Sequence, residues 1–212
     1  MSKHQTIGDG TGLHGRAITT ALEMLEESQS RIPQLEDIAQ VMDKRLDQIT
    51  AIFPDSHSLI VAAAEQALVR LMDDCIKAVV KVDPDDAVAQ FIALGEAYVQ
   101  WAVTYRTQFR MMSDDRLIDT LNTPQLRRYL NSLAELMTRM LERARDTGNL
   151  SPEENIPLMV LSSRTFAYGL ARMLVDRRMS EWWPDMEPME AARLALNDFV
   201  RRTARGSYRR MR

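Results

Sequence analysis

Four side chains that could contact a nucleic acid lie within seven positions of one another: Lys44, Arg45, Gln48 and Thr50. The two cations can bind phosphate or guanine, and the amide of Gln48 can bind adenine. Thr50 can contact a phosphate group or the methyl group of a thymine. If one exposed face of a helix carries all four side chains, we expect that face to contact DNA.

The acidic residues around these four side chains oppose the binding of DNA. Asp43 and Asp47 lie beside them in the sequence and repel phosphate. Residues 1–60 carry five Lys and Arg against nine Asp and Glu, a net charge of −4, while the whole chain has a net charge of −3. Because contacts between cations and phosphate supply much of the affinity for DNA, we expect weak binding that falls steeply as the salt concentration rises.

Side chains suited to catalysis or metal binding are scarce. The histidines are His4, His14 and His57, and none belongs to a Glu-x-x-His pair of the kind that holds a di-iron site. A single cysteine and the lack of clustered histidines argue against a zinc site. The sequence also lacks a Gly-rich phosphate loop and a serine nucleophile elbow. We therefore expect no catalytic residue, no metal, no cofactor and no enzyme activity.

The single cysteine, Cys75, excludes an internal disulfide and fits a reducing cytoplasm. The sequence has no run of about 18 apolar residues, so we expect no transmembrane span and no membrane partner. The first residues, MSKHQTIGDGTG, lack the apolar segment of a secretory signal. We predict that they form a disordered arm, that order begins near Leu13, and that the protein is cytoplasmic.

The stretch from Gln34 to Leu59 positions the four candidate side chains. Its apolar residues recur at the i, i+3, i+4 spacing of a helix in two short runs. Pro54 ends the second run, because the residue before a proline is pushed out of the helical region. The pattern predicts a helix-turn-helix, whose second helix can enter the major groove. The inward-facing residues are Leu35, Ile38 and Ala39 on the first helix and Ile49, Ile52 and Phe53 on the second.

This stretch resembles the helix-turn-helix of the TetR family of bacterial transcription regulators. The family pattern, roughly I-A-x-x-A-G-V-S-x-x-T-L-Y-x-H-F-x-x-K-x-x-L, aligns with Ile38 to Leu59 without a gap. The apolar frame is kept, but several positions that mark the family differ. In this chain the turn glycine is Asp43, the small residue before it is Met42, the capping serine is Arg45, the tyrosine is Thr50, the histidine is Ile52 and the phosphate-touching lysine is Ser56.

After the helix-turn-helix, the sequence predicts further helices and shows no convincing alternation of apolar and polar residues that would indicate a β-strand. We expect an all-α protein of about nine helices. Residues 1–57 would form a three-helix helix-turn-helix head with its disordered arm, and residues 58–212 a helical ligand-binding and dimerisation body. Asp83 followed by Pro84 predicts the start of one body helix. The run from Ser151 to Glu154 resembles a capping box. Because Pro157 follows too soon for one straight helix, we expect a turn and then a helix to about Asp176.

Aromatic and methionine side chains are spread over several predicted body helices. Together they predict a mostly apolar cavity, the usual form of a small-molecule site, and the resemblance implies a ligand in this body. Adaptable methionine walls favour an apolar or aromatic ligand, while Arg106, Arg110 and Arg164 leave an anionic ligand open. The candidate ligand-binding residues are Trp101, Tyr105, Phe109, Met112, Tyr129, Met137, Phe166 and Met173.

The resemblance also implies a homodimer in which the last two long helices pack against their copies. The apolar stripe of the last helix is too wide for a single buried side, which favours the same arrangement. The candidate interface residues are Leu170, Leu174, Ala191, Leu194, Ala195 and Phe199.

These features predict a homodimeric, ligand-responsive transcription regulator that binds operator DNA. As the resemblance implies, it would be a repressor that a small molecule releases from its operator by shifting the fourth helix and separating the two heads. One alternative keeps the fold but has lost DNA binding, and acts as a ligand sensor or a protein-interaction module. A second alternative, a helical enzyme with an internal pocket, is opposed by the missing catalytic side chains.

Overall fold

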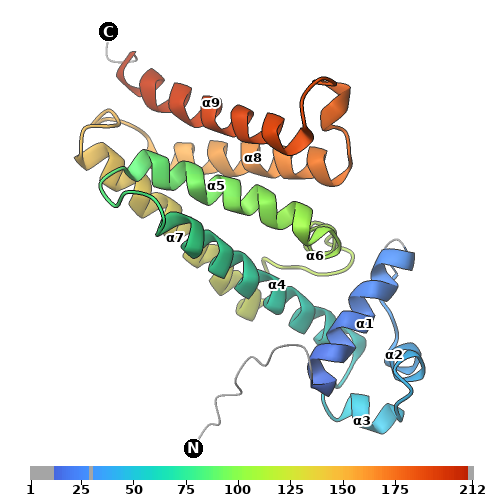
Figure 1. Ribbon diagram of the computed structural model, residues 1–212. Helices are drawn as coiled ribbons and strands as arrows, with labels where there is room; N and C mark the ends of the chain where they lie inside the picture. Colours follow the sequence, from blue (N-terminus) through green and yellow to red (C-terminus); the bar gives the residue numbers. More distant parts are fainter. Residues whose placement is uncertain (1–11, 29–30, 210–212) are drawn as a thin grey trace, which may run out of the picture. The chain divides into compact units, whose positions relative to one another are not determined.

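The computed structural model describes residues 12–28 and 31–209, and every regular element in these ranges is a helix (Figure 1). The prediction of an all-α fold is confirmed. The predicted disordered N-terminal arm lies outside the described residues. None of the described helices is long and apolar enough to cross a membrane.

The chain forms two compact units, Met1–Ala67 with Thr107–Arg127 and Leu68–Arg106 with Arg128–Arg212. Their boundary falls inside helix α4, whereas the sequence pattern divides the chain after residue 57. The predicted division after residue 57 separates a DNA-binding head from a ligand-binding and dimerisation body. That assignment of functions stays a prediction. The helices that lie wholly or partly in the first unit are α1 (Leu13–Ser28), α2 (Leu35–Val41), α3 (Leu46–Thr50), α4 (Ser56–Val79) and α6 (Arg106–Met112). Helix α7 (Pro124–Asp146) also begins in the first unit and continues into the second. The remaining helices are α5 (Ala87–Thr104), α8 (Ile156–Val175), the 3₁₀ helix η1 (Met179–Glu181) and α9 (Pro188–Arg209).

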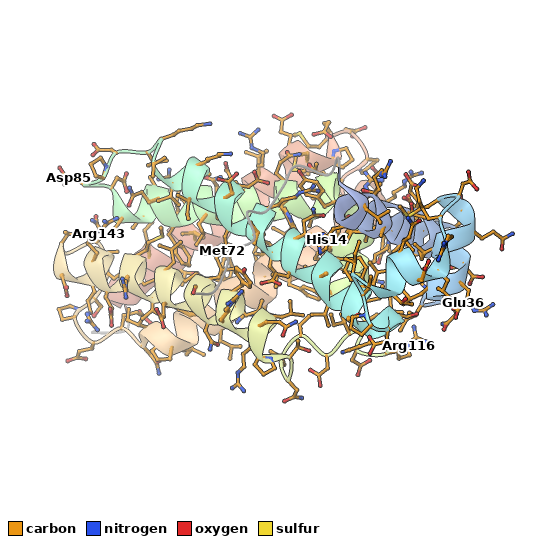
Figure 2. The ribbon with its side chains drawn as sticks, turned by 90° about the horizontal axis from the view of Figure 1, so that it is seen from below. His14, Glu36, Met72, Asp85, Arg116 and Arg143 are labelled. Carbon is orange, nitrogen blue, oxygen red and sulfur yellow. The ribbon has the colours of Figure 1, made fainter. Side chains whose placement is uncertain are left out.

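The first unit has its core where the apolar periodicity of the head helices predicts it. Ile18 of α1, Ile38 of α2 and Ile49 of α3 are completely or almost completely buried. The ring of His14, labelled in Figure 2, lies 4.9 Å from the ring of Phe53 between their centroids. This packing fixes which side of α3 faces the core, and so fixes which side is left for a partner.

The second unit has a core in which α5, α8 and α9 pack on one another (Figure 1). Gly95 lets α5 and α9 approach closely, because a Cβ atom at this position would lie only 2.9 Å from Cδ2 of Leu196. At the other side of α5, Nη2 of Arg143, which Figure 2 labels on α7, donates to Oε1 of Gln90. The buried cluster contains Val99, Ala167, Leu170, Leu174, Met179, Ala191, Ala192 and Leu196.

Two helix starts differ from the sequence prediction. Asp86, not Asp83, caps α5, because Oδ1 of Asp86 accepts the backbone N–H of Ala89 at 2.8 Å. Asp83 lies one turn earlier, where its carbonyl oxygen accepts the backbone N–H of Asp86 at 3.1 Å and closes a turn. The predicted start at Asp83 is therefore wrong by one turn of chain.

The predicted capping box at Ser151 does not start a helix, although the turn predicted before Pro157 is present. Helix α8 begins at Ile156, and Oδ1 of Asn155 caps it by accepting the backbone N–H of Leu158 at 3.0 Å. The hydroxyl oxygen of Ser151 instead accepts the backbone N–H of Glu153 at 3.3 Å within a turn. A serine that bonds two residues ahead stabilises a turn and leaves the helix to start at the next capping side chain.

Candidate functional site

The turn between α2 and α3 is closed by the two hydrogen bonds of a Schellman motif. The backbone N–H of Lys44 donates to the carbonyl oxygen of Ala39 at 2.9 Å, and that of Asp43 donates to Gln40 at 3.1 Å. Asp43 has a φ of 50°, a left-handed conformation in which glycine is most comfortable. The structure thus explains why the related pattern has glycine here, and shows that Asp43 adopts the same backbone.

All four candidate DNA-binding side chains lie on the exposed side of this turn and of α3. Lys44 precedes α3, and within the described residues it forms no ion pair. Thr50 ends α3, and its hydroxyl donates to the carbonyl oxygen of Asp47 at 3.3 Å. The acidic surroundings are equally exposed, as Glu36 on α2 shows in Figure 2. The predicted face therefore exists, with cations and carboxylates side by side.

Arg45 and Gln48 are already engaged in local contacts. The Nε atom of Arg45 donates to Oδ1 of Asp47 at 3.0 Å, and Nη2 donates to Oδ2 of the same carboxylate. The side-chain oxygen of Gln48 accepts the backbone N–H of Arg45 at 3.3 Å and so helps to cap α3. An exposed ion pair contributes only about 0–1 kcal/mol, so Arg45 can exchange the carboxylate of Asp47 for a phosphate or a guanine at small cost.

The left-handed turn gives a stability prediction. Replacing Asp43 with glycine should raise the free energy of unfolding by about 0.5–1 kcal/mol, because it removes backbone strain and a negative charge at the C-terminal end of α2. Urea denaturation measures the change. Asp43→Asn separates the two causes, since it removes only the charge. Gly148→Ala is the opposite control: at a φ of 77° with no atom near the new Cβ, it should lower stability by about 1 kcal/mol.

The eight candidate ligand-binding residues do not form one cluster within a single unit. Phe109 and Met112 belong to the first unit, and the other six belong to the second. In the second unit Phe166 stacks on Phe199 of α9, with ring centroids 4.2 Å apart. Met173 packs against the core of α5, α8 and α9. Their role in ligand binding stays a prediction, but Phe166 and Met173 clearly serve the core of the second unit.

Trp101 and Tyr105 belong to a row of aromatic rings along α5. The rings of Tyr98 and Trp101 lie 6.3 Å apart, and those of Trp101 and Tyr105 lie 6.2 Å apart. The guanidinium of Arg70 lies over the ring of Tyr105 at 5.4 Å from its centroid. Burial raises the pKa of Tyr98 well above its ordinary value, so its phenol stays protonated. Of the other two candidates in this unit, Met137 is buried, and the ring of Tyr129 is covered by the guanidinium of Arg128 at 4.9 Å.

The second unit has a pocket of about 310 Å³ among the ends of α5, α8 and α9. None of the eight candidate ligand-binding residues lines it. Its apolar wall consists of Val103, Leu174, Met179, Pro188 and Met189, and its polar residues are Arg106, Arg177, Ser180 and Glu187. The pocket therefore combines an apolar wall with two arginine residues.

The candidate dimer residues divide into two groups. Leu170, Leu174 and Ala191 are buried within the chain itself, in the core of α5, α8 and α9. Leu194 is exposed, and Ala195 and Phe199 are half-buried. The structure also leaves an apolar row open along α8, which consists of Leu158, Leu161 and Tyr168. These three residues were not among the sequence candidates, because α8 has apolar residues on more than one side and its sequence does not reveal which side its own chain covers.

Side chains for metal binding or thiol chemistry are not gathered in the described part of the chain. No group of three or more His, Cys, Asp or Glu residues there could hold a metal ion. Burial, with a smaller contribution from Asp74, raises the pKa of Cys75 to about 12. This thiol stays protonated near neutral pH, where a nucleophile would need to be a thiolate.

Residues 91–199, just over half of the chain, match the family model described as "Tetracyclin repressor-like, C-terminal domain". The chain belongs to the TetR family. The resemblance seen in the helix-turn-helix is therefore confirmed by a match in a different part of the sequence. The curated proteins compared with this TetR-family chain include no match.

Solved structures share the fold of this TetR-family chain. A protein with unknown function from Rhodococcus sp. RHA1 is similar with a TM-score of 0.75 and 20% identity, over 94% of this chain and 98% of that one. The TetR family transcriptional regulator PfmR from Thermus thermophilus has a TM-score of 0.69 and 19% identity, over 88% and 97%. The fatty acid degradation regulator FadR from Bacillus halodurans has a TM-score of 0.70 and 10% identity, over 90% and 95%. The fold and the family support a transcription regulator.

Most pocket residues of this TetR-family chain were missed by sequence reasoning. It named Arg106 among the arginines that leave an anionic ligand open, and it placed Leu174 at the dimer interface. Arg177, Ser180 and Glu187 lie in a segment that has no helical period to interpret. The one available signal was the pair Arg177 and Arg178 directly after a predicted helix, which sequence reasoning assigns to a helix end. Only the packing of three helix ends brings these residues beside Val103.

Proposed function

We propose that this chain is a homodimeric DNA-binding regulator, a repressor that a small molecule releases from its operator. The observation that carries the proposal is the exposed side of α3 in a TetR-family chain, where Lys44, Arg45 and Gln48 stand together without cover from the described residues. A helix-turn-helix uses this side of its second helix in the major groove.

Recognition would begin with the two cations. Lys44 lies at the turn, where it can contact a phosphate, and Arg45 lies at the start of α3, where it can contact a phosphate or the edge of a guanine. Arg45 must first leave Asp47, and that carboxylate then lies near the phosphates. The negative charge of Asp47 therefore lowers affinity even after the exchange, which predicts weak and strongly salt-dependent binding.

The dimer would form through the open faces of α8 and α9. Leu158, Leu161 and Tyr168 on α8 and Leu194 on α9 are large apolar side chains left exposed by their own chain. A two-fold axis through this surface would bury each of them against a second copy. Two heads in one dimer can then bind two half-sites of the operator. Once the first head is bound, binding of the second is intramolecular, so the overall affinity for DNA exceeds that of a weak single head.

A ligand in the second unit would control the distance between the heads. The ligand must prefer one arrangement of the dimer, since equal affinity for both arrangements shifts nothing. Helix α4 is a continuous helix that begins in the first unit and ends in the second. It is therefore the natural element to carry a change from one unit to the other.

The DNA proposal is tested by releasing Arg45. Asp47→Ser removes both the partner of Arg45 and a charge beside the phosphates, so binding to a fragment of the protein's own promoter should tighten by about tenfold at low salt. Arg45→Ala should weaken binding by about 1–3 kcal/mol if Arg45 contacts a base. Fluorescence anisotropy at a series of salt concentrations measures both. Asp85→Ser, which makes the same charge change in the loop before α5, should leave affinity almost unchanged.

A second candidate function is favoured by the same surface. The head has an excess of acidic residues, and Val41 and Leu46 are exposed apolar side chains beside the turn. These features suit a protein partner as well as DNA. If both the wild type and Asp47→Ser fail to bind promoter DNA at low salt, the chain is better explained as a ligand sensor that acts through another protein.

A further inference from the structure

The pocket at the ends of α5, α8 and α9 is a second candidate binding site, separate from the aromatic row on α5. Its volume of about 310 Å³ lies within the range of pockets that hold small organic molecules. We infer that it binds an organic monoanion: a carboxylate at the two guanidinium groups with an apolar body along the methionine wall.

The charges that line the pocket favour an anion. Arg106 and Arg177 contribute two positive charges, and Glu187 contributes one negative charge. The carboxylate of Glu187 is engaged in capping α9, where Oε2 accepts the backbone N–H of Glu190 at 2.8 Å. This hydrogen bond holds the carboxylate at the start of α9, and within the described residues it forms no ion pair with either arginine. The three side chains together carry a net charge of +1, which matches one carboxylate, and two guanidinium groups can bind a carboxylate through charge-assisted hydrogen bonds.

Arg177 differs from the arginines that flank it. Arg172 pairs with Asp176 at 2.7 Å, and Arg178 pairs with Glu181 at 3.4 Å. Within the described residues Arg177 has no carboxylate partner, nor does Arg106, whose Nε donates to the carbonyl oxygen of Val103 at 3.2 Å. The two flanking arginines outside the pocket are thus paired with carboxylates, whereas the two that line it are not.

The backbone at Arg177 gives independent support. Its φ is 58°, and it occupies the position after α8 that glycine usually takes: its N–H donates to Leu174 at 3.0 Å, and the N–H of Arg178 donates to Met173 at 2.8 Å. A residue with a side chain held in this conformation is strained, and such strain gathers at functional positions. A charged side chain facing the pocket supplies a reason for arginine here.

The apolar wall narrows the class of ligand. Val103, Leu174, Met179 and Met189 line the pocket together with the hydroxyl of Ser180. A small inorganic anion would leave this wall exposed to water, whereas an apolar body would cover it. Methionine side chains adapt to irregular shapes, so the pocket suits a carboxylate with a short hydrocarbon or aromatic body.

Binding at this pocket needs no DNA, and only its regulatory consequence rests on the proposed function. Arg106 is the last residue of the second unit, and Thr107, the next residue, belongs to the first. The hydroxyl of Thr107 donates to Oε2 of Glu26 on α1 at 3.2 Å. A ligand that binds Arg106 therefore contacts the residue directly before Thr107, whose hydrogen bond to Glu26 lies within the unit that contains the helix-turn-helix.

The site is tested by isothermal titration calorimetry on the full chain, with octanoate as the probe. Octan-1-ol, which has the same chain length but no charge, is the control ligand. We expect octanoate to bind more tightly than octanol. Arg177→Gly should weaken octanoate binding by about tenfold to a hundredfold, as expected for the loss of a charged hydrogen-bond partner, while octanol binding stays unchanged. Arg177→Lys should restore most of the affinity. Arg178→Gly, which removes the paired neighbour outside the pocket, should bind octanoate like the wild type.

Arg177→Gly should also fold well, because glycine suits the left-handed position, and its melting temperature should match or exceed that of the wild type. Loss of octanoate binding in a variant with an unchanged melting temperature would support the site. Equal octanoate affinity in the wild type and Arg177→Gly would overturn it, as would octanoate that binds no better than octanol. Neither result depends on whether the head binds DNA.

Discussion

Replacing Trp101 with alanine should lower the free energy of unfolding by about 3–5 kcal/mol, which is the range for removing a large buried aromatic side chain. Trp101 is only 2% exposed and lies between the rings of Tyr98 and Tyr105 on α5. Its removal leaves a cavity in the second unit, whose lining loses contacts that water cannot replace. Urea denaturation followed by circular dichroism measures the change.

Trp182 is the matched control for Trp101. It is the same residue type but is 77% exposed in the segment between α8 and α9. Trp182→Ala should change stability by less than about 0.5 kcal/mol, as for most surface substitutions. A loss below about 1 kcal/mol for Trp101→Ala would contradict the core role. It would instead indicate that Trp101 lines an open cavity, which is the role that the ligand prediction from the sequence gives it.

Replacing Leu161 and Leu194 together with glutamate should convert the proposed dimer to monomers. These side chains are 63% and 46% exposed in the single chain, so the charges cost little in the folded monomer. Two-fold symmetry places each substitution at the proposed interface twice, and a buried charge without a partner costs several kcal/mol. We therefore expect the dimer to weaken by at least about a hundredfold, which sedimentation velocity measures.

Leu121→Glu is the control for the dimer variant. Leu121 is exposed to a similar degree as Leu161 but lies in the segment between α6 and α7, within the first unit. This variant should sediment like the wild type. Circular dichroism should show that all variants keep their helices. A double glutamate variant that stays dimeric would show that the exposed faces of α8 and α9 do not form the interface. The proposed arrangement of the two heads would then be wrong as well.

The head of the protein was predicted well because its signals are local. The spacing of Ile38, Ile49 and Phe53 defines a buried side for two short helices, and the helix-turn-helix follows from that spacing and from Pro54. Helix starts were harder, since several side chains near each end can act as a cap. Asp86 and Asn155 cap α5 and α8, where the sequence favoured Asp83 and Ser151. A side chain caps only if the backbone after it turns into a helix, and that depends on packing further along the chain.

The sequence by itself determined the all-α fold, the helix-turn-helix and the family, because apolar periodicity and a gapless pattern are properties of neighbouring residues. It assigned Phe166 to a ligand cavity, and Leu170 and Phe199 to a dimer interface. Only the tertiary structure decided what covers them: Phe166 stacks on Phe199, and Leu170 lies in the core of its own chain. The same holds for the pocket, which Arg106 and Arg177 both line although 71 positions separate them in the sequence. Periodicity reports that a side is buried, but the neighbour that buries it is chosen by the packing of distant helices.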